Sequence, residues 1–147
     1  MSEMLANRYF LSGRYADAAG EFEELLEAHP PRVAVRRRLV ICYTMTGRLR
    51  DALDLAVDIM REDPDAAAQA DPQVEGFSCK QARNQLRERA KELTPGAYHT
   101  SLGLLQLFCD EEKALEELTQ ALRIVPKYHD VHRLKTLVKR HLEAGHV

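Results

Sequence analysis

The chain has 147 residues, of which 45% are hydrophobic and 30% are charged, and its formal net charge is −2. This balance is typical of a folded globular chain and excludes a predominantly disordered one. A charge this close to zero provides no overall field for binding nucleic acid or an anionic membrane surface.

Residues 1–64 contain two copies of one pattern, separated by 34 residues. Each copy has a tyrosine, a Gly-Arg pair, a small alanine and a closing proline. These are Tyr9, Gly13, Arg14, Ala18 and Pro30 in the first copy, and Tyr43, Gly47, Arg48, Ala52 and Pro64 in the second. A fixed period of this length indicates a repeat protein.

Each copy predicts two helices joined by a tight turn at the glycine. Between the glycine and the proline, apolar residues recur at steps of three and four, which places them on one face of an α-helix. They are Tyr15, Ala18, Ala19, Phe22, Leu25 and Leu26, and then Leu49, Ala52, Leu53, Ala56, Ile59 and Met60. A shorter apolar stripe before each glycine predicts the first helix of the pair. Glycine adopts the left-handed conformation that ends a helix, and proline cannot continue one.

Residues 65–95 are less regular. The stretch 63–78 is rich in Ala, Asp and Pro and is predicted to be a loop with room for one short helical turn. Residues 79–93 carry a thin apolar stripe and predict a helix, which we interpret as the second helix of a degenerate repeat that closes at Pro95.

The last part of the chain predicts a further helix pair and a terminal helix. The stretches 98–108 and 111–126 form the pair, and Asp110 is a candidate N-cap between them. The terminal helix begins near Asp130 and ends at Gly145. Its apolar inner side and basic outer side are what a repeat stack needs at its end, so we interpret it as a capping helix.

The period and the spacing resemble the tetratricopeptide repeat (TPR) family. That family's motif has an aromatic residue late in the first helix and a glycine at the turn, followed by an aromatic residue, an alanine, a second aromatic residue and a proline. The corresponding residues are Tyr9, Gly13, Tyr15, Ala18, Phe22 and Pro30, and then Tyr43, Gly47, Leu49, Ala52, Ala56 and Pro64. The second copy thus lacks two aromatics, and Ser2 and Arg36 stand where the motif has an early tryptophan.

The resemblance implies an all-α fold, a right-handed superhelical stack of antiparallel helix pairs with a C-terminal capping helix. We expect one domain, 1–147, whose parts follow in order. They are repeat 1 (1–32), repeat 2 (33–64), an irregular loop and degenerate repeat (65–95), a TPR-like pair (96–126) and the capping helix (127–147).

The implied function is that of a protein-interaction adaptor or chaperone, which binds a peptide or helix of its partner in the concave groove lined by the first helices of the pairs. Two alternatives stay open. One is a structural or oligomerising subunit of a larger complex, and the other is a secretion-type TPR chaperone, a class of about this length.

The family register places residues of the first helices in that groove, and the arginine run 36–38 lies beside them. Arginine is suited to binding carboxylates, so the partner is expected to offer an acidic or extended segment. The residue set with which some family members hold the C-terminal carboxylate of heat-shock chaperones is broken here by Glu3 and Arg38. Purely solvated arginines are the competing interpretation. The predicted partner-binding residues are Asn7, Leu11, Arg37, Arg38, Ile41, Thr44 and Met45.

The three cysteines, Cys42, Cys79 and Cys109, are far apart in the sequence. An odd number with no close pair is interpreted as reduced, partly buried thiols of a cytoplasmic protein. The sequence begins without a signal-peptide pattern and contains no window apolar enough to span a membrane. We therefore expect a cytoplasmic protein without membrane contact, and homo-oligomerisation stays open.

Catalytic and cofactor sites have no support in the sequence. His129 and His132 are neighbours on a helix, but no Cys-x-x-Cys or His-Glu-x-x-His pattern accompanies them. No glycine-rich phosphate loop is present, and the basic last helix lacks the interleaved aromatics that stack on bases. We expect no enzyme activity, no metal and no cofactor, and nucleic-acid binding ranks below protein binding.

Overall fold

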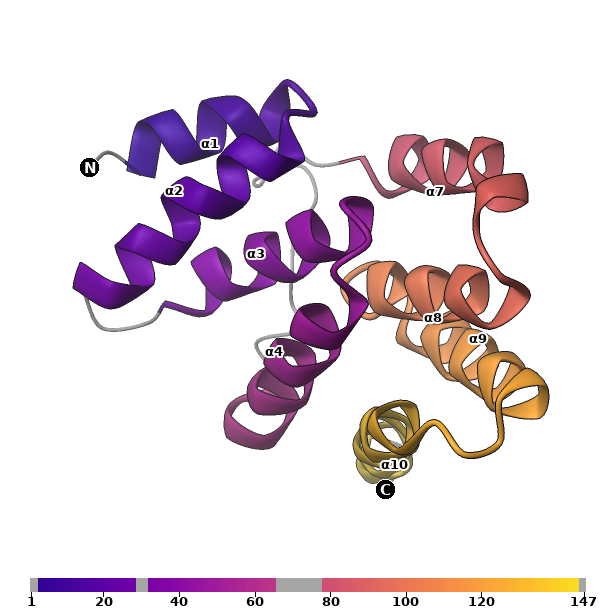
Figure 1. The fold of residues 1–147 in the computed structure, drawn as a ribbon. Coiled ribbons are helices and arrows are strands. Elements are labelled where there is room, and N and C mark those ends of the chain that lie inside the picture. The colour runs from indigo at the N-terminus through magenta and orange to yellow at the C-terminus, as the bar shows by residue number, and fades with distance from the viewer. Residues whose placement is uncertain (1–2, 29–31, 66–77, 146–147) are drawn as a thin grey trace.

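The computed structural model describes residues 3–28, 32–65 and 78–145, and it confirms the expected all-α fold. These ranges contain eight α-helices, one short 3₁₀-helix and no strand (Figure 1). The elements are α1 (Glu3–Leu11), α2 (Tyr15–Ala28), α3 (Val33–Met45), α4 (Leu49–Glu62), α7 (Cys79–Glu88), η1 (Ala90–Glu92), α8 (Pro95–Gln106), α9 (Glu111–Ile124) and α10 (His129–Ala144). Most of the predicted loop at 63–78, and the closing Pro30, lie outside the described residues.

Two glycines make the turns within the first two helix pairs. Gly13 has φ +79° and Gly47 has φ +81°, a conformation that other residues rarely adopt. The same hydrogen bond closes both turns. Arg14 N donates to Tyr9 O at 2.9 Å, and Arg48 N donates to Tyr43 O at 2.8 Å. The shared Gly-Arg pair of the sequence therefore encodes one turn geometry used twice.

Small residues lie where helices approach most closely. Ala18 of α2 and Ala52 of α4 are fully buried. In the second half, Gly103 of α8 faces α9, and a Cβ atom at this position would lie 2.7 Å from Leu118 Cδ2. A residue larger than glycine cannot be placed there without moving α9 or repacking Leu118.

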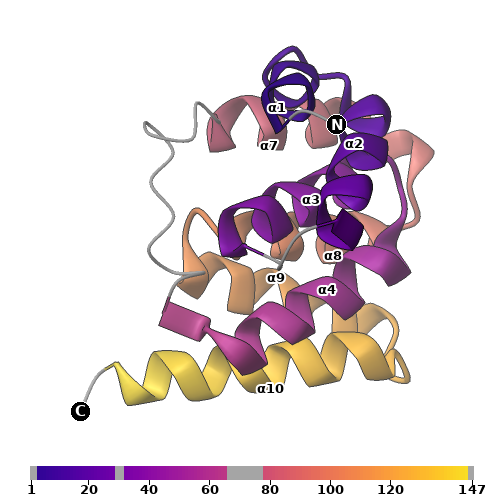
Figure 2. The same cartoon turned by 90° about the vertical axis from the view of Figure 1, so that its left-hand side faces the viewer.

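The second half of the chain does not simply extend the stack. α8 packs against both α3 and α4, and α10 packs between α4 and α9. The contacts therefore close a ring of helices in the order α3, α4, α10, α9, α8 (Figures 1 and 2). The terminal helix buries Val131, Leu134 and Val138 as its predicted inner side, but it joins the second repeat to the last pair instead of covering the last pair alone.

The segment before α8 differs from the prediction in two ways. The helix predicted for 79–93 ends at Glu88 and is followed by η1. Pro95 does not close a repeat but occupies the first turn of α8, where its missing N–H costs nothing. Thr94 Oγ1 caps this helix by accepting a hydrogen bond of 3.2 Å from Ala97 N.

The prediction of three reduced cysteines is wrong for two of them. Cys79, the first residue of α7, forms a disulfide with Cys109, just after α8, and Cys42 is free and buried. The partners are 30 residues apart in sequence, and nothing in the spacing reveals that α7 returns to the far end of α8. No helix in the described part of the chain is both long and apolar enough to cross a membrane.

Candidate binding surface

Helix α1 has one open face because it lies at the edge of the structure and packs chiefly on α2 (Figure 1). Its inner side buries Ala6 and Phe10. Met4 and Leu11 lie elsewhere on the helix and are 71% and 59% exposed. Seven residues apart, they share a face after about two turns. This pairing of large apolar side chains on an unpacked face marks α1 as a candidate contact surface.

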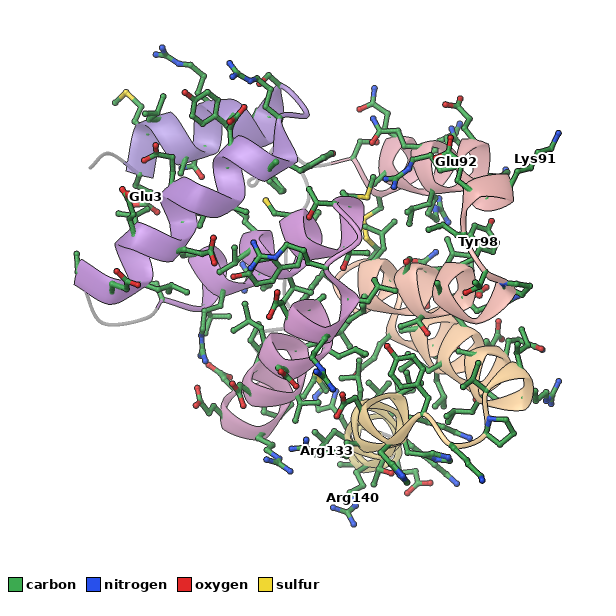
Figure 3. The ribbon with its side chains drawn as sticks, in the orientation of Figure 1. Glu3, Lys91, Glu92, Tyr98, Arg133 and Arg140 are labelled. Carbon is green, nitrogen blue, oxygen red and sulfur yellow. A yellow bond between two sulfur atoms is a disulfide. The ribbon has the colours of Figure 1, made fainter. Side chains whose placement is uncertain are left out.

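An open hollow runs along this part of α1. The described residues that line it are Glu3, Met4, Asn7, Arg8, Leu11 and Ser12. We call this set the α1 face. It combines two exposed apolar side chains with an amide and with the exposed guanidinium of Arg8. Figure 3 places Glu3 at the beginning of the helix.

Two predicted binding residues meet across the first helices of the two repeats. Arg38 Nη1 of α3 donates a hydrogen bond of 2.8 Å to Asn7 Oδ1 of α1. Arg32, just before α3, forms an ion pair with Glu3 of α1. The N-terminal half of α3 is thus tied to α1 by two polar contacts, and both end on residues of the α1 face.

The three neighbouring arginines have different surroundings. Arg36 is 8% exposed, and its Nη1 lies 2.6 Å from Glu62 Oε2 at the end of α4. Arg36 therefore joins the two helices of its own pair, while Arg38 reaches α1. Arg37 and Arg38 are both half-buried. The interpretation of the run as purely solvated does not fit this arrangement.

The predicted groove is filled at the C-terminal half of α3. Ile41 and Thr44 are each 2% exposed, and Met45 is 6% exposed. Thr44 Oγ1 donates to Val40 O at 2.8 Å, and Arg89 Nη1 donates to Met45 O at 2.7 Å. The expectation that these three residues line an open groove does not fit their burial, because α8 packs on α3. Among the predicted residues, only Leu11 is strongly exposed.

Sequence reasoning missed Met4 and Arg8. A signal was available for Met4, since it precedes Leu11 by seven residues and lies off the stripe that packs on α2. The sequence also assigned no structural role to His141 of α10. Its Nδ1 lies 2.6 Å from Glu111 Oε1, and its Nε2 lies 2.8 Å from Asp65 Oδ1. The hydrogen bonds to Asp65 and then to Glu111 raise the pKa of His141 above its usual value.

A metal site in the described part of the chain would need several ligating side chains close together. No group of three or more His, Cys, Asp or Glu side chains there could hold a metal ion. The contacts of His141 connect α10 to the start of α9 and to the residues after α4. We call this set of contacts the junction at His141, and its role is structural.

The comparisons with known proteins identify the repeat in the first half of the chain. A family model described as "Tetratricopeptide repeat" matches residues 9–71, which include α2, α3 and α4. Neither curated proteins nor solved structures gave a match to this chain.

Proposed function

Because this chain is a protein of the tetratricopeptide repeat family, whose repeats generally mediate protein–protein interaction, we propose that it is an adaptor that binds a partner protein through the α1 face. The observation that carries this proposal is the exposure of Met4 and Leu11 on one side of a helix whose other side buries Ala6 and Phe10. Burying one such side chain stabilises a complex by about 1.5–3 kcal/mol, before the cost of association is subtracted.

The geometry of the α1 face suggests the kind of segment that fits it. Met4 and Leu11 are separated by about 10 Å along the helix axis, at 1.5 Å per residue. An extended segment covers that distance in about three residues and a helix in about seven. Either one would place two apolar side chains against the pair. The exposed Arg8 beside them favours a partner that carries a carboxylate near its apolar side chains.

A binding role rather than a catalytic one is part of the proposal. Residues of the α1 face offer apolar area, one amide and charged groups, which suit recognition. A cytoplasmic location stays a prediction. The disulfide between Cys79 and Cys109 weighs against a strongly reducing compartment, because disulfides persist under oxidising conditions.

Affinity capture with two matched variants tests the proposal. Met4→Glu with Leu11→Glu places two charges on the α1 face, at positions exposed enough to leave the fold intact. Lys139→Glu with Arg140→Glu changes two exposed residues of α10, on the opposite side of the molecule (Figures 2 and 3). Proteins captured by the wild-type chain should be lost by the first variant and kept by the second. If the first variant keeps them all, the α1 face is not the binding surface.

Two further outcomes of the same experiment bear on the alternatives. If the only captured protein is another copy of the chain, the oligomerising alternative replaces the adaptor. If the α10 variant alone loses its partners, binding occurs at the C-terminal helix, and the proposal fails.

A further inference from the structure

Helix α7 is the least firmly packed helix that the structure describes. It contacts chiefly α8 and the following η1, and its buried side chains are Ala82 and Leu86. Most of its other residues are exposed. A helix of 10 residues is not stable alone in water, so α7 depends on what attaches it to the rest of the chain.

Two attachments hold α7, one near each end. At its first residue, the disulfide joins Cys79 to Cys109. Just beyond its last residue, Arg89 Nη1 donates a hydrogen bond of 2.7 Å to the carbonyl oxygen of Met45, at the end of α3. The covalent attachment is the stronger one, because both groups of a broken hydrogen bond can bond to water instead, whereas the disulfide opens only by a chemical reaction.

We propose that the Cys79–Cys109 disulfide is a redox-controlled latch that holds α7 on α8, and that its reduction releases α7. The released state exposes the surface of α8 that α7 covers, together with the buried Ala82 and Leu86. It also removes the hydrogen bond that Arg89 donates to the carbonyl group of Met45, while the rest of α3 stays packed. The latch does not depend on binding at the α1 face, because none of its residues lies on α1.

The chemistry requires a dithiol reductant, supplied by the compartment or by a redox protein. One thiolate of the dithiol attacks a sulfur of the disulfide and forms a mixed disulfide, and the other cysteine leaves as a thiolate. The second thiolate of the dithiol then displaces the protein sulfur. Cys79 and Cys109 each end as a thiol with a proton from solvent, and the dithiol ends as a disulfide.

Exposure makes this exchange selective. Cys79 and Cys109 are partly exposed, so a reductant can reach the bond. Cys42 is fully buried in α3, and burial raises the pKa of its thiol to about 12. A buried thiol that stays protonated neither attacks a disulfide nor reacts with a reagent in solution. Exchange is therefore confined to the pair that holds α7.

Amide hydrogen exchange of the full chain, with and without a dithiol reductant such as dithiothreitol, tests the latch. The double variant Cys79→Ser with Cys109→Ser is measured under the same two conditions. We expect exchange in α7 to accelerate about tenfold on reduction, as in local release of a helix, while α3 and α4 keep their protection. The double variant should resemble the reduced wild-type chain under both conditions.

Three results would overturn the proposal. The first is unchanged protection of α7 on reduction, which would mean that packing on α8 is sufficient. The second is an equal loss of protection in all helices, which would make the disulfide a staple of the whole fold. The third comes from thiol titration of the denatured, unreduced chain. In this titration one reactive thiol is expected, that of Cys42. Three reactive thiols would show that the disulfide is not formed.

Discussion

Arg38 Nη1 donates a hydrogen bond of 2.8 Å to Asn7 Oδ1, and this bond links the first helices of the two repeats. Asn7 also lines the hollow along α1. Arg38 therefore acts on the α1 face in two ways. It fixes the orientation of the Asn7 amide, and it adds a positive charge beside the surface that we propose for partner binding.

Charge reversal at α3 should weaken binding without unfolding the chain. Arg37→Glu with Arg38→Glu removes the bond to Asn7 and places a carboxylate beside the α1 face. An acidic partner segment would be repelled, so we expect capture to be lost while the helical circular dichroism signal is kept. Wild-type capture should also weaken with added salt, because exposed charges are screened over about 8–10 Å. Arg133→Glu, on the outer side of α10, is the matched control (Figure 3). Equal capture by all three chains would show that recognition does not involve these charges.

Gly103→Ala should destabilise the fold by about 1–3 kcal/mol through overpacking. The added Cβ would lie 2.7 Å from Leu118 Cδ2, and Leu118 is fully buried, so it has little room to move. Gly20→Ala in α2 is the matched control, since nothing lies within 4 Å of the added atom. The control should stabilise the chain by about 0.5–1 kcal/mol because alanine favours the helix. Denaturant unfolding of both variants gives the two changes in the free energy of unfolding. Changes of the same sign would contradict the packing of α8 on α9.

The small residues of the repeats give a second stability prediction. Ala18→Leu or Ala52→Leu should each cost about 1–3 kcal/mol, because both alanines are fully buried between helices. Ala16→Leu lies on the exposed side of α2 and should change the free energy of unfolding by less than about 0.5 kcal/mol. If thermal unfolding shows equal effects for Ala16→Leu and Ala18→Leu, the assignment of the packed face of α2 is wrong.

The junction at His141 predicts a pH dependence of stability. Its pKa in the folded chain is raised, first by the hydrogen bond to Asp65 and then by that to Glu111. The contribution of His141 to stability is therefore fully present below its unfolded pKa of about 6.5, and it is lost as the pH rises through the raised folded value.

The stability difference between the wild-type chain and His141→Gln should thus shrink on going from about pH 6 to alkaline pH. Urea unfolding across that range measures it. His132→Gln provides the control, because His132 is exposed and its Nε2 contacts an uncharged group, the carbonyl oxygen of Pro126. If the stability difference between the wild-type chain and His141→Gln grows with pH, the assigned direction of the pKa shift is wrong.

Local signals made the helices and their ends predictable. Gly13 and Gly47 could be identified as turns because few residues other than glycine adopt their positive φ. Asp110 was predictable as an N-cap and does cap α9, where its Oδ1 accepts a hydrogen bond of 3.2 Å from Lys113 N. Gly145 follows the last helix as predicted. Each of these features depends on residues within one or two turns of the position concerned.

The features that could not be predicted depend on contacts between distant parts of the chain. Ile41 and Met45 have the spacing of groove residues, and only the packing of α8 on α3 decides that they are buried. The partner of Cys79 is likewise set by the path of the chain through α7 and α8. Met4 and Leu11 show the opposite case, since the repeat pattern alone does not reveal that nothing in the described part of the chain covers them.

Site-specific photo-crosslinking tests the central claim most directly. A photoreactive phenylalanine analogue, p-benzoylphenylalanine, replaces Leu11 on the α1 face in one chain and Lys139 on α10 in a second, and both are irradiated in a native extract of the source cells. The account predicts a discrete crosslinked species to another protein from position 11 and none from position 139. A crosslink from position 139 with none from position 11 would contradict the proposal that the chain binds its partner through α1.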